Sequence, residues 1–308
     1  MKGLLFLSTT MVISSSSLMI VWASLELNAL CMCFMISSEM KKKKEKMDPT
    51  AMYFLVQSVA SILLLWSLGM NPHLWAQTTT VMMILMKMGA WPLHTWYLKT
   101  IPSMSFHMES MKLVMTWQKV GPLFLLLMLS SEIMVMMVAI CTLVGPTLSL
   151  SGLLKMKPLM TLSSISNSGW MILGMICSPE IMSMFLILYS SSLVMSLNFL
   201  SNNTSKDKVT RKNFFETATI LGNMGGLPPL MIFSAKVLVI NKMIQSCVSN
   251  TVVVGVMLVS CAFLYYYCWA LSTMVMLNPE KSQNLYKEWP HTPKVIFFLS
   301  GLSLMTLL

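Results

Sequence analysis

The chain has 308 residues, of which 56% are hydrophobic and only 10% are charged. Soluble domains carry about 25% charged residues, so this composition excludes an ordinary soluble protein and indicates a polytopic membrane protein. The formal charge of +10 could suggest a nucleic-acid-binding protein, and the positions of the basic residues along the chain decide between the two.

Apolar segments about 20 residues long follow one another along the chain, and each can cross a hydrocarbon core of about 30 Å as a helix. The sequence therefore predicts an all-α polytopic membrane fold, with residues 1–308 forming a single transmembrane domain. The boundary between the first two helices is poorly marked, because no charged loop interrupts residues 3–38 and the serines at 14–17 give no clear turn signal. We expect eleven helices, at 3–21, 22–38, 50–69, 78–98, 109–129, 132–150, 157–177, 181–200, 213–240, 250–276 and 294–308.

The basic residues are distributed unevenly between the loops. When the loops are assigned alternately to the two sides, most of the 21 Lys and Arg residues fall on one side and only Lys242 falls on the other. This asymmetry is typical of the positive-inside rule. It predicts that the N-terminus and the basic loops share one side and that the C-terminus lies opposite. The run KKKKEK at 41–46 is interpreted as an orienting loop rather than a nucleic-acid site.

The sequence shows no pattern of a catalytic, metal or cofactor site. The seven cysteines have no paired CxxC spacing, and the 35 methionines are spread over most of the spans, so both are interpreted as apolar filler rather than metal ligands. Phosphate-binding loops, haem motifs and nucleophile triads are absent from the sequence. We therefore expect no redox chemistry in this chain alone.

Four ionisable residues lie within the predicted spans, where charged groups are costly and rare. Lys87 and Lys119 fall near the middle of their spans, Lys236 follows a glycine- and proline-rich stretch, and Glu26 lies early in the second span. Lys112 is closer to a span end and is expected to extend toward the membrane surface. If Glu26 approaches Lys87, moving or screening the pair changes the proton affinity of the lysine, as a proton relay requires.

Two of the spans contain helix-breaking residues beside a lysine. The fourth span has Gly89 and Pro92, and the ninth reads GGLPPLMIFSAK. Broken backbone at membrane depth is tolerated where it lines a cavity enclosed by protein. Helices five spans apart cross the bilayer in opposite directions, so breaks in the fourth and ninth spans predict an inverted repeat. The breaking residues of the ninth span are Gly225, Gly226, Pro228 and Pro229.

Several polar residues in the spans are secondary candidates. His94 on the broken fourth span could equally pack and hydrogen bond or carry a proton. Ser163, Ser164, Ser166 and Asn167 form a polar stripe in the seventh span. This stripe could hold water or bond neighbouring helices, and its interruption of an apolar span favours water.

The order of these motifs resembles the second-subunit family of mitochondrial NADH:ubiquinone oxidoreductase (respiratory complex I), a family of antiporter-like membrane subunits. The resemblance covers about residues 20–240. It rests on SLELN at 24–28, KKKKEKMDP followed by YFLVQSVAS, MKMGAWPLHTW at 86–96, MTWQK at 115–119, LSSISNSGW at 162–170 and GGLPPLMIFSAK at 225–236.

The resemblance implies a role for each buried ionisable residue. Glu26 and Lys87 match the family's proton-loading pair, Lys119 its central lysine and Lys236 its distal lysine. It also implies a mitochondrial inner-membrane location with the basic loops in the matrix. NADH, flavin, iron–sulfur clusters and ubiquinone are then expected in other subunits, and the partners are membrane-arm and accessory subunits of complex I and lipids, without nucleic acid.

The chain departs from the family pattern at three positions. Asn167 stands where the family commonly has a histidine, and an amide does not carry a proton at physiological pH. Lys99 replaces a usual glutamate, and Trp269 replaces a common arginine.

The sequence favours a proton-translocating, non-redox subunit of a respiratory NADH:quinone oxidoreductase. Two alternatives stay open. A free-standing cation/proton antiporter would use the same lysines and inverted repeat. A membrane scaffold would use the buried lysines only for pairing, although their mid-span positions argue against this.

Overall fold

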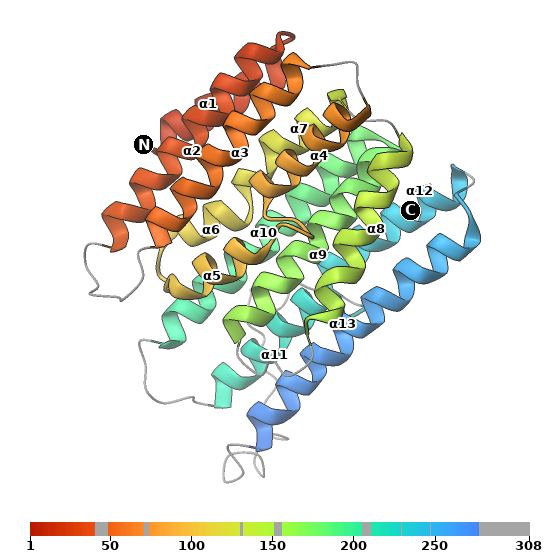
Figure 1. Cartoon of the computed structure of the whole chain (residues 1–308). Helices are drawn as coiled ribbons and strands as arrows, with labels where there is room; N and C mark the ends of the chain where they lie inside the picture. Colours follow the sequence, from red (N-terminus) through yellow and green to blue (C-terminus); the bar gives the residue numbers. More distant parts are fainter. Residues whose placement is uncertain are drawn as a thin grey trace. The chain divides into compact units, whose positions relative to one another are not determined.

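The structure is a computed structural model that describes residues 1–40, 49–70, 74–129, 132–150, 156–204, 211–228, 230–246 and 248–276 (Figure 1). Its described residues contain helices and no strand, which confirms the predicted all-α class. The helices are α1 (Lys2–Ser14), α2 (Leu18–Met40), α3 (Pro49–Gly69), α4 (Leu74–Met88), α5 (Thr95–Ser103), α6 (Glu109–Met115), the 3₁₀ helix η1 (Trp117–Lys119), α7 (Val120–Leu129), α8 (Glu132–Leu148), α9 (Met156–Cys177), α10 (Pro179–Thr204), α11 (Arg211–Gly225), α12 (Met231–Gln245) and α13 (Asn250–Met276).

The helices carry the surface of a membrane protein. Large apolar side chains point outward, for example Ile62, Ile133 and Leu258, which are each more than half exposed. An apolar surface of this kind is favourable in contact with lipid chains and unfavourable in contact with water. By length and composition, five helical segments of the described chain can cross a membrane: Leu18–Met40, Pro49–Gly69, Glu109–Leu129, Pro179–Ser201 and Asn250–Ser272. The predicted count of eleven is not confirmed, and the predicted helix at 294–308 and the basic run at 41–46 lie outside the described residues.

The boundary between the first two helices differs from the prediction. It was expected at residues 21 and 22, but α1 ends at Ser14 and α2 begins at Leu18. Ser15 adopts an extended conformation with φ −85° and ψ 137°. Serine has a lower helix propensity than the straight-chain apolar residues around it, and four serines in succession weaken the helix at this point.

Two predicted spans are interrupted beside a glycine with positive φ. Helix α4 ends at Met88, before Gly89 with φ +70°, and α5 begins at Thr95. Helix α11 ends at Gly225, before Gly226 with φ +84°, and α12 begins at Met231. Because this region of φ favours glycine, both glycines allow the chain to leave the helix. Pro228 lies in the second interruption, and Pro229 lies outside the described residues.

A third interruption was not predicted. The span expected at 109–129 consists of α6, the single turn η1 and α7. Pro122 in the first turn of α7 has no N–H to donate to the carbonyl of Gln118, four residues earlier, and its ring would crowd that carbonyl. The tighter turn at 117–119 avoids this conflict, and it contains Lys119.

The described residues form two compact units. Unit 1 comprises Met1–Pro146 and Ser164–Ile172, and unit 2 comprises Thr147–Ser163 and the described residues from Leu173 onward, so α9 contributes to both. The single domain predicted for residues 1–308 therefore stays a prediction.

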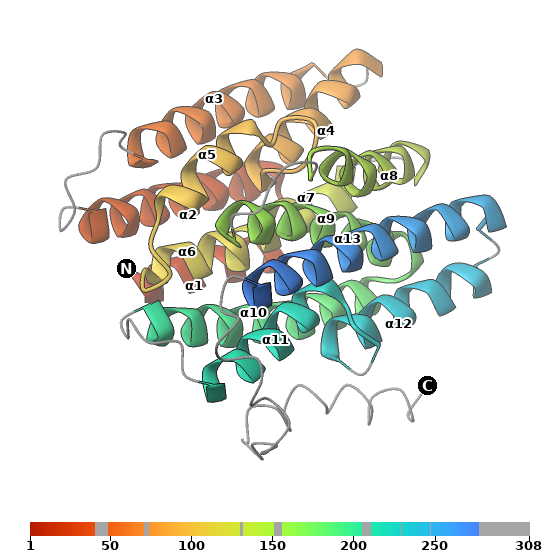
Figure 2. The ribbon, with the colours of Figure 1, turned by 90° about the horizontal axis from the view of Figure 1, so that it is seen from below.

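Each unit packs its helices side by side. In unit 1, the successive helices α1, α2, α3 and α4 pack against one another, as Figure 1 shows from red to orange. In unit 2, α10 packs on α12 and α11 packs on α13 (Figure 2). The core of unit 2 includes Phe199, Ile220 and Leu230.

Candidate functional site

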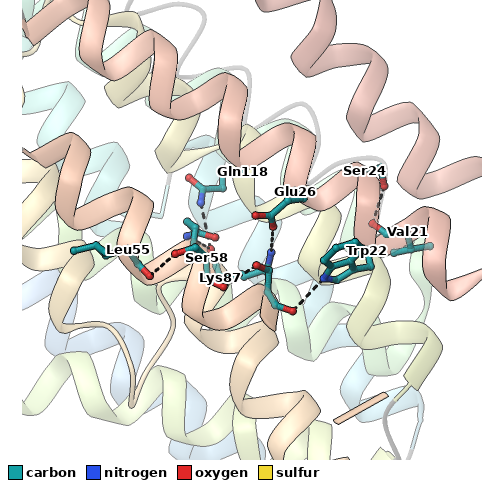
Figure 3. Close-up of polar contacts among 10 residues, drawn as sticks. Val21, Trp22, Ser24, Glu26, Leu55, Ser58, Lys87 and Gln118 are labelled. Carbon is teal, nitrogen blue, oxygen red and sulfur yellow. Dashed lines mark hydrogen bonds and ion pairs between the residues drawn. The ribbon is translucent and has the colours of Figure 1, made fainter. Parts of the chain in front are cut away.

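Unit 1 contains an ion pair between Glu26 on α2 and Lys87 at the end of α4 (Figure 3). The Lys87 Nζ atom lies 3.6 Å from Glu26 Oε2, which is ion-pair distance but too long for a direct hydrogen bond. The lysine side chain is 3% exposed and the glutamate side chain 28%. The structure thus brings together the two residues that the sequence analysis paired.

Neighbouring contacts position both members of this pair. Trp22 lies one helical turn before Glu26, and its Nε1 donates a hydrogen bond to the Ser61 carbonyl on α3 at 3.0 Å (Figure 3). At the other end of the pair, Trp96 Nε1 donates to the Met86 carbonyl in the last turn of α4, also at 3.0 Å. Each helix that carries a charged partner is therefore bonded to a neighbouring segment.

The glycine at the α4 break also allows an aromatic ring to approach closely. A Cβ atom added at Gly89 would lie 2.7 Å from Cδ2 of Tyr97. Tyr97 is buried in the first turn of α5, and its ring therefore packs directly on the break. Gly89 is thus required by both its positive φ and this contact.

Lys119 occupies a second buried polar site in unit 1. It lies on η1 and is 1% exposed. Its Nζ donates to the Ser164 carbonyl at 2.6 Å and to Ser164 Oγ at 2.8 Å, and it lies 5.7 Å from the ring centroid of Tyr97. The Tyr97 hydroxyl is 3.0 Å from the same Ser164 Oγ. A buried lysine that donates to two oxygens and faces an aromatic ring has the partners that a charged group needs away from water.

The polar stripe predicted in the seventh span is divided between the two units. Ser164 and Asn167 belong to unit 1, whereas Ser163 belongs to unit 2, where its Oγ accepts a hydrogen bond of 2.7 Å from the Tyr267 hydroxyl. Asn167 is buried, and its Nδ2 has no hydrogen-bond partner among the described residues. Of this stripe, the structure places Ser164 against Lys119.

His94 lies directly before α5, in the segment that follows the α4 break. It is buried, and its Nδ1 hydrogen bonds the Pro92 carbonyl at 3.2 Å. This local contact holds the ring against the turn.

Lys236 lies on α12 in unit 2 and is 5% exposed. Its amino group packs over the α11 break, since a Cβ atom added at Gly226 would lie 3.0 Å from Lys236 Nζ. Across this break, Asn223 Oδ1 accepts a hydrogen bond of 3.3 Å from the Ile232 backbone N–H. This amide satisfies one of the free donors at the start of α12.

Replacing Gly226 with alanine is expected to destabilise unit 2. An alanine with φ near +84° is strained by about 1–2 kcal/mol, and its methyl group would press on the Lys236 amino group. The midpoint of thermal unfolding in detergent measures the loss. Gly255→Ala on α13 is the control, because no atom lies within 4 Å of its added Cβ. Equal unfolding midpoints for the two variants would contradict the need for glycine at position 226.

The sequence analysis missed three residues of the unit 1 site. These are Tyr97, which contacts both Gly89 and Ser164, and the amides Gln57 and Gln118, which donate to the Lys87 backbone. Gln118 could have been noticed as a second polar residue beside Lys119 in an apolar span. The contacts of Tyr97 and Gln57 depend on tertiary packing and leave no local pattern.

No group of three or more His, Cys, Asp or Glu side chains in the described parts of the chain is arranged to hold a metal ion. The polar centres of the site are instead lysines, a carboxylate, hydroxyls and amides. Of these groups, the lysines and the carboxylate can bind and release a proton, whereas the hydroxyls and amides offer hydrogen bonds.

The chain is similar in sequence to known respiratory proteins. The family model described as "NADH:quinone oxidoreductase/Mrp antiporter, TM" matches residues 68–263. The NADH-ubiquinone oxidoreductase chain 2 of Locusta migratoria is 31% identical, over 91% of this chain and 87% of that protein. The protein of the same name from Lycodon semicarinatus is 27% identical, over 98% of this chain and 94% of that protein.

Solved structures share the fold. A chain of respiratory complex I from Thermus thermophilus with bound aureothin matches 98% of this chain and 75% of its own length, with a TM-score of 0.73 and 18% identity. A chain of the Mrp complex from a Dietzia species matches 88% of this chain and 59% of its own length, with a TM-score of 0.71 and 14% identity. From the family model and the sequence relatives together, the chain belongs to the NADH-ubiquinone oxidoreductase chain 2 family of antiporter-like membrane proteins.

Proposed function

We propose that this chain is a proton-translocating membrane-arm subunit of NADH:ubiquinone oxidoreductase. The observation that carries the proposal is the Glu26–Lys87 ion pair, with Lys87 buried, in a membrane chain of this family. Buried ionisable groups are costly in a membrane protein and mark ion or proton pathways.

The ion pair provides a physical basis for proton transfer. A relay needs a group whose proton affinity changes between two arrangements, and a lysine beside a movable carboxylate has this property. The Glu26 side chain is partly exposed and the Lys87 side chain is buried. The carboxylate is therefore the member of the pair that solvent or a neighbouring subunit can contact. In the proposed sequence, a proton loaded at this pair passes to Lys119 and then to Lys236. Quinone reduction in other subunits supplies the energy through conformational and electrostatic coupling.

The proposed topology has eleven transmembrane helices arranged as an antiporter-like inverted repeat. It is supported by the uneven distribution of basic residues and by the interruptions after α4 and α11, each beside a buried lysine. The N-terminus and the basic loops would face the mitochondrial matrix, and Lys236 would release protons toward the opposite side of the inner membrane.

The chain would act as a non-redox subunit of the enzyme. NADH, flavin, iron–sulfur clusters and ubiquinone would be bound by other subunits. Its partners would be membrane-arm and accessory subunits together with lipids, and nucleic acid would not be among them.

Replacing Ser164 with alanine is expected to weaken the Lys119 site without removing the lysine. The change deletes one acceptor of Lys119 Nζ and the partner of the Tyr97 hydroxyl. A hydrogen bond to a charged group contributes about 1.5–3 kcal/mol, so coupled NADH oxidation should fall by about tenfold or more. Ser67→Ala on α3 is the matched control, because that buried hydroxyl donates to the Leu64 carbonyl of its own helix. Full coupled activity of Ser164→Ala in assembled complex would contradict this role.

Native electrophoresis of gently solubilised membranes tests the proposed function. The chain should co-migrate with a very large assembly that stains for NADH oxidation. Migration as a small, inactive species from intact membranes would contradict the proposal and support a free-standing cation/proton antiporter.

A further inference from the structure

The break after α4 leaves the backbone carbonyl of Lys87 without its helical donor. In a continuous helix this carbonyl would accept from the N–H four residues later, but the helix ends at Met88. Two side-chain amides occupy its place. Gln57 Nε2 and Gln118 Nε2 each donate to the Lys87 carbonyl oxygen at 3.3 Å.

The two amides come from different elements. Gln57 lies on α3 and Gln118 on η1, and their residues are 3% and 7% exposed. Buried amides are costly unless they are hydrogen bonded, and the Lys87 carbonyl accepts a hydrogen bond from both of these donors. Both residues line the same cavity as Lys87, together with Asn28 and Tyr53.

We propose that Gln57 and Gln118 are positioning residues that hold the broken end of α4 and thereby keep Lys87 beside Glu26. The two hydrogen bonds to the Lys87 carbonyl fix the backbone at this residue. Only rotation of the Lys87 side chain then changes its distance from the Glu26 carboxylate. The inference rests on the proposed function, because it assigns a purpose to the position of Lys87.

Gln118 adds a connection between the two lysines of unit 1. It is the neighbour of Lys119 in the single turn of η1, and its amide bonds the backbone of Lys87. One hydrogen bond therefore links the segment of the ion pair to the segment of the second lysine. Transfer between two groups depends steeply on their separation, so this link sets a distance that matters for proton passage.

A general packing role is the competing explanation. If the amides only stabilise unit 1, their loss should lower the amount of assembled complex and should not depend on the Lys87 side chain. If they act through Lys87, their loss should matter only while that side chain is present. Contacting residues that act through one group show such non-additive effects.

The test uses the whole complex assembled with Gln57→Met, Gln118→Met or both, each with and without Lys87→Met. Methionine keeps the length of the side chain and removes the amide donor. Protons translocated per NADH oxidised and coupled turnover are measured per assembled complex. Gln77→Met on the partly exposed face of α4 is the control.

Each single variant is expected to lower coupled turnover by about three- to tenfold, and neither should reduce it further in the Lys87→Met background. Native proton-to-electron ratios and turnover in both single variants would overturn the inference. Equal fractional losses with and without Lys87→Met would overturn it as well, in favour of packing.

The same variants separate the inference from the proposed function. If Lys87→Met alone pumped normally, the proposed function and the inference would both fail. A defect of Lys87→Met together with normal glutamine variants would remove the inference only.

Discussion

Replacement of Lys119 with methionine is expected to lower coupled NADH oxidation and proton translocation by about tenfold or more, while the complex still assembles. Methionine is similar in length and apolar, so it fills the space of a side chain that is 1% exposed. It cannot hold a proton or donate to Ser164. A pathway that depends on this group should then be interrupted.

The control for this variant is Lys99→Met, which removes the same charge from the exposed face of α5. Assembly is checked by native electrophoresis, and NADH oxidation by the electron-input part of the complex is measured with an artificial acceptor. Equal proton translocation by the Lys119 and Lys99 variants would contradict a role of Lys119 in transfer.

Replacement of Gly89 with alanine is expected to prevent stable folding of unit 1. The added Cβ would lie 2.7 Å from Tyr97 Cδ2 and 3.0 Å from Tyr97 Cβ, at a φ of +70°. The backbone strain contributes about 1–2 kcal/mol, and displacing a buried aromatic ring adds to it. The chain should be recovered in much smaller amounts, and little or none of it in the assembled complex.

The matched control for this change is Gly69→Ala at the end of α3, where the added Cβ has no atom within 4 Å. Quantitative immunodetection of the chain in membranes and in the native complex compares the two variants. Wild-type amounts of the Gly89→Ala chain in the active complex would show that the break does not need glycine.

The general architecture could be predicted from the sequence because it follows from composition and local chemistry. Continuous apolar segments of about 20 residues favour helices in lipid, since a helix satisfies its backbone hydrogen bonds within the segment. Gly89 and Gly226 signalled the interruptions because few other residues leave a helix with positive φ. Lys87, Lys119 and Lys236, which are buried, and the partly exposed Glu26 could be singled out because charges are rare where water is absent.

Other features could not be predicted because they depend on competition between weak local signals. The first helix boundary was expected at residues 21 and 22, but α1 ends at Ser14 and α2 begins at Leu18. Four serines in an otherwise apolar run are only a weak signal for a break. The turn η1 was missed because Pro122 acts on the preceding turn, upstream of its own position.

The convergence of Gln57 and Gln118 on one carbonyl depends on contacts between α3, α4 and η1 that are remote in sequence. A single chain without tertiary information gives no register for such contacts. The sequence likewise did not show whether Glu26 approaches Lys87. The structure places Lys87 Nζ 3.6 Å from Glu26 Oε2.

The ratio of protons translocated to NADH oxidised in Lys87→Met complex, reconstituted in sealed vesicles, tests the central claim most directly. Glu26→Gln and the double variant are measured beside it. The account predicts a reduced ratio or strongly reduced coupled turnover in both single variants, with no further loss in the double variant, because both residues act as one pair. A wild-type ratio and turnover in fully assembled Lys87→Met complex would contradict it.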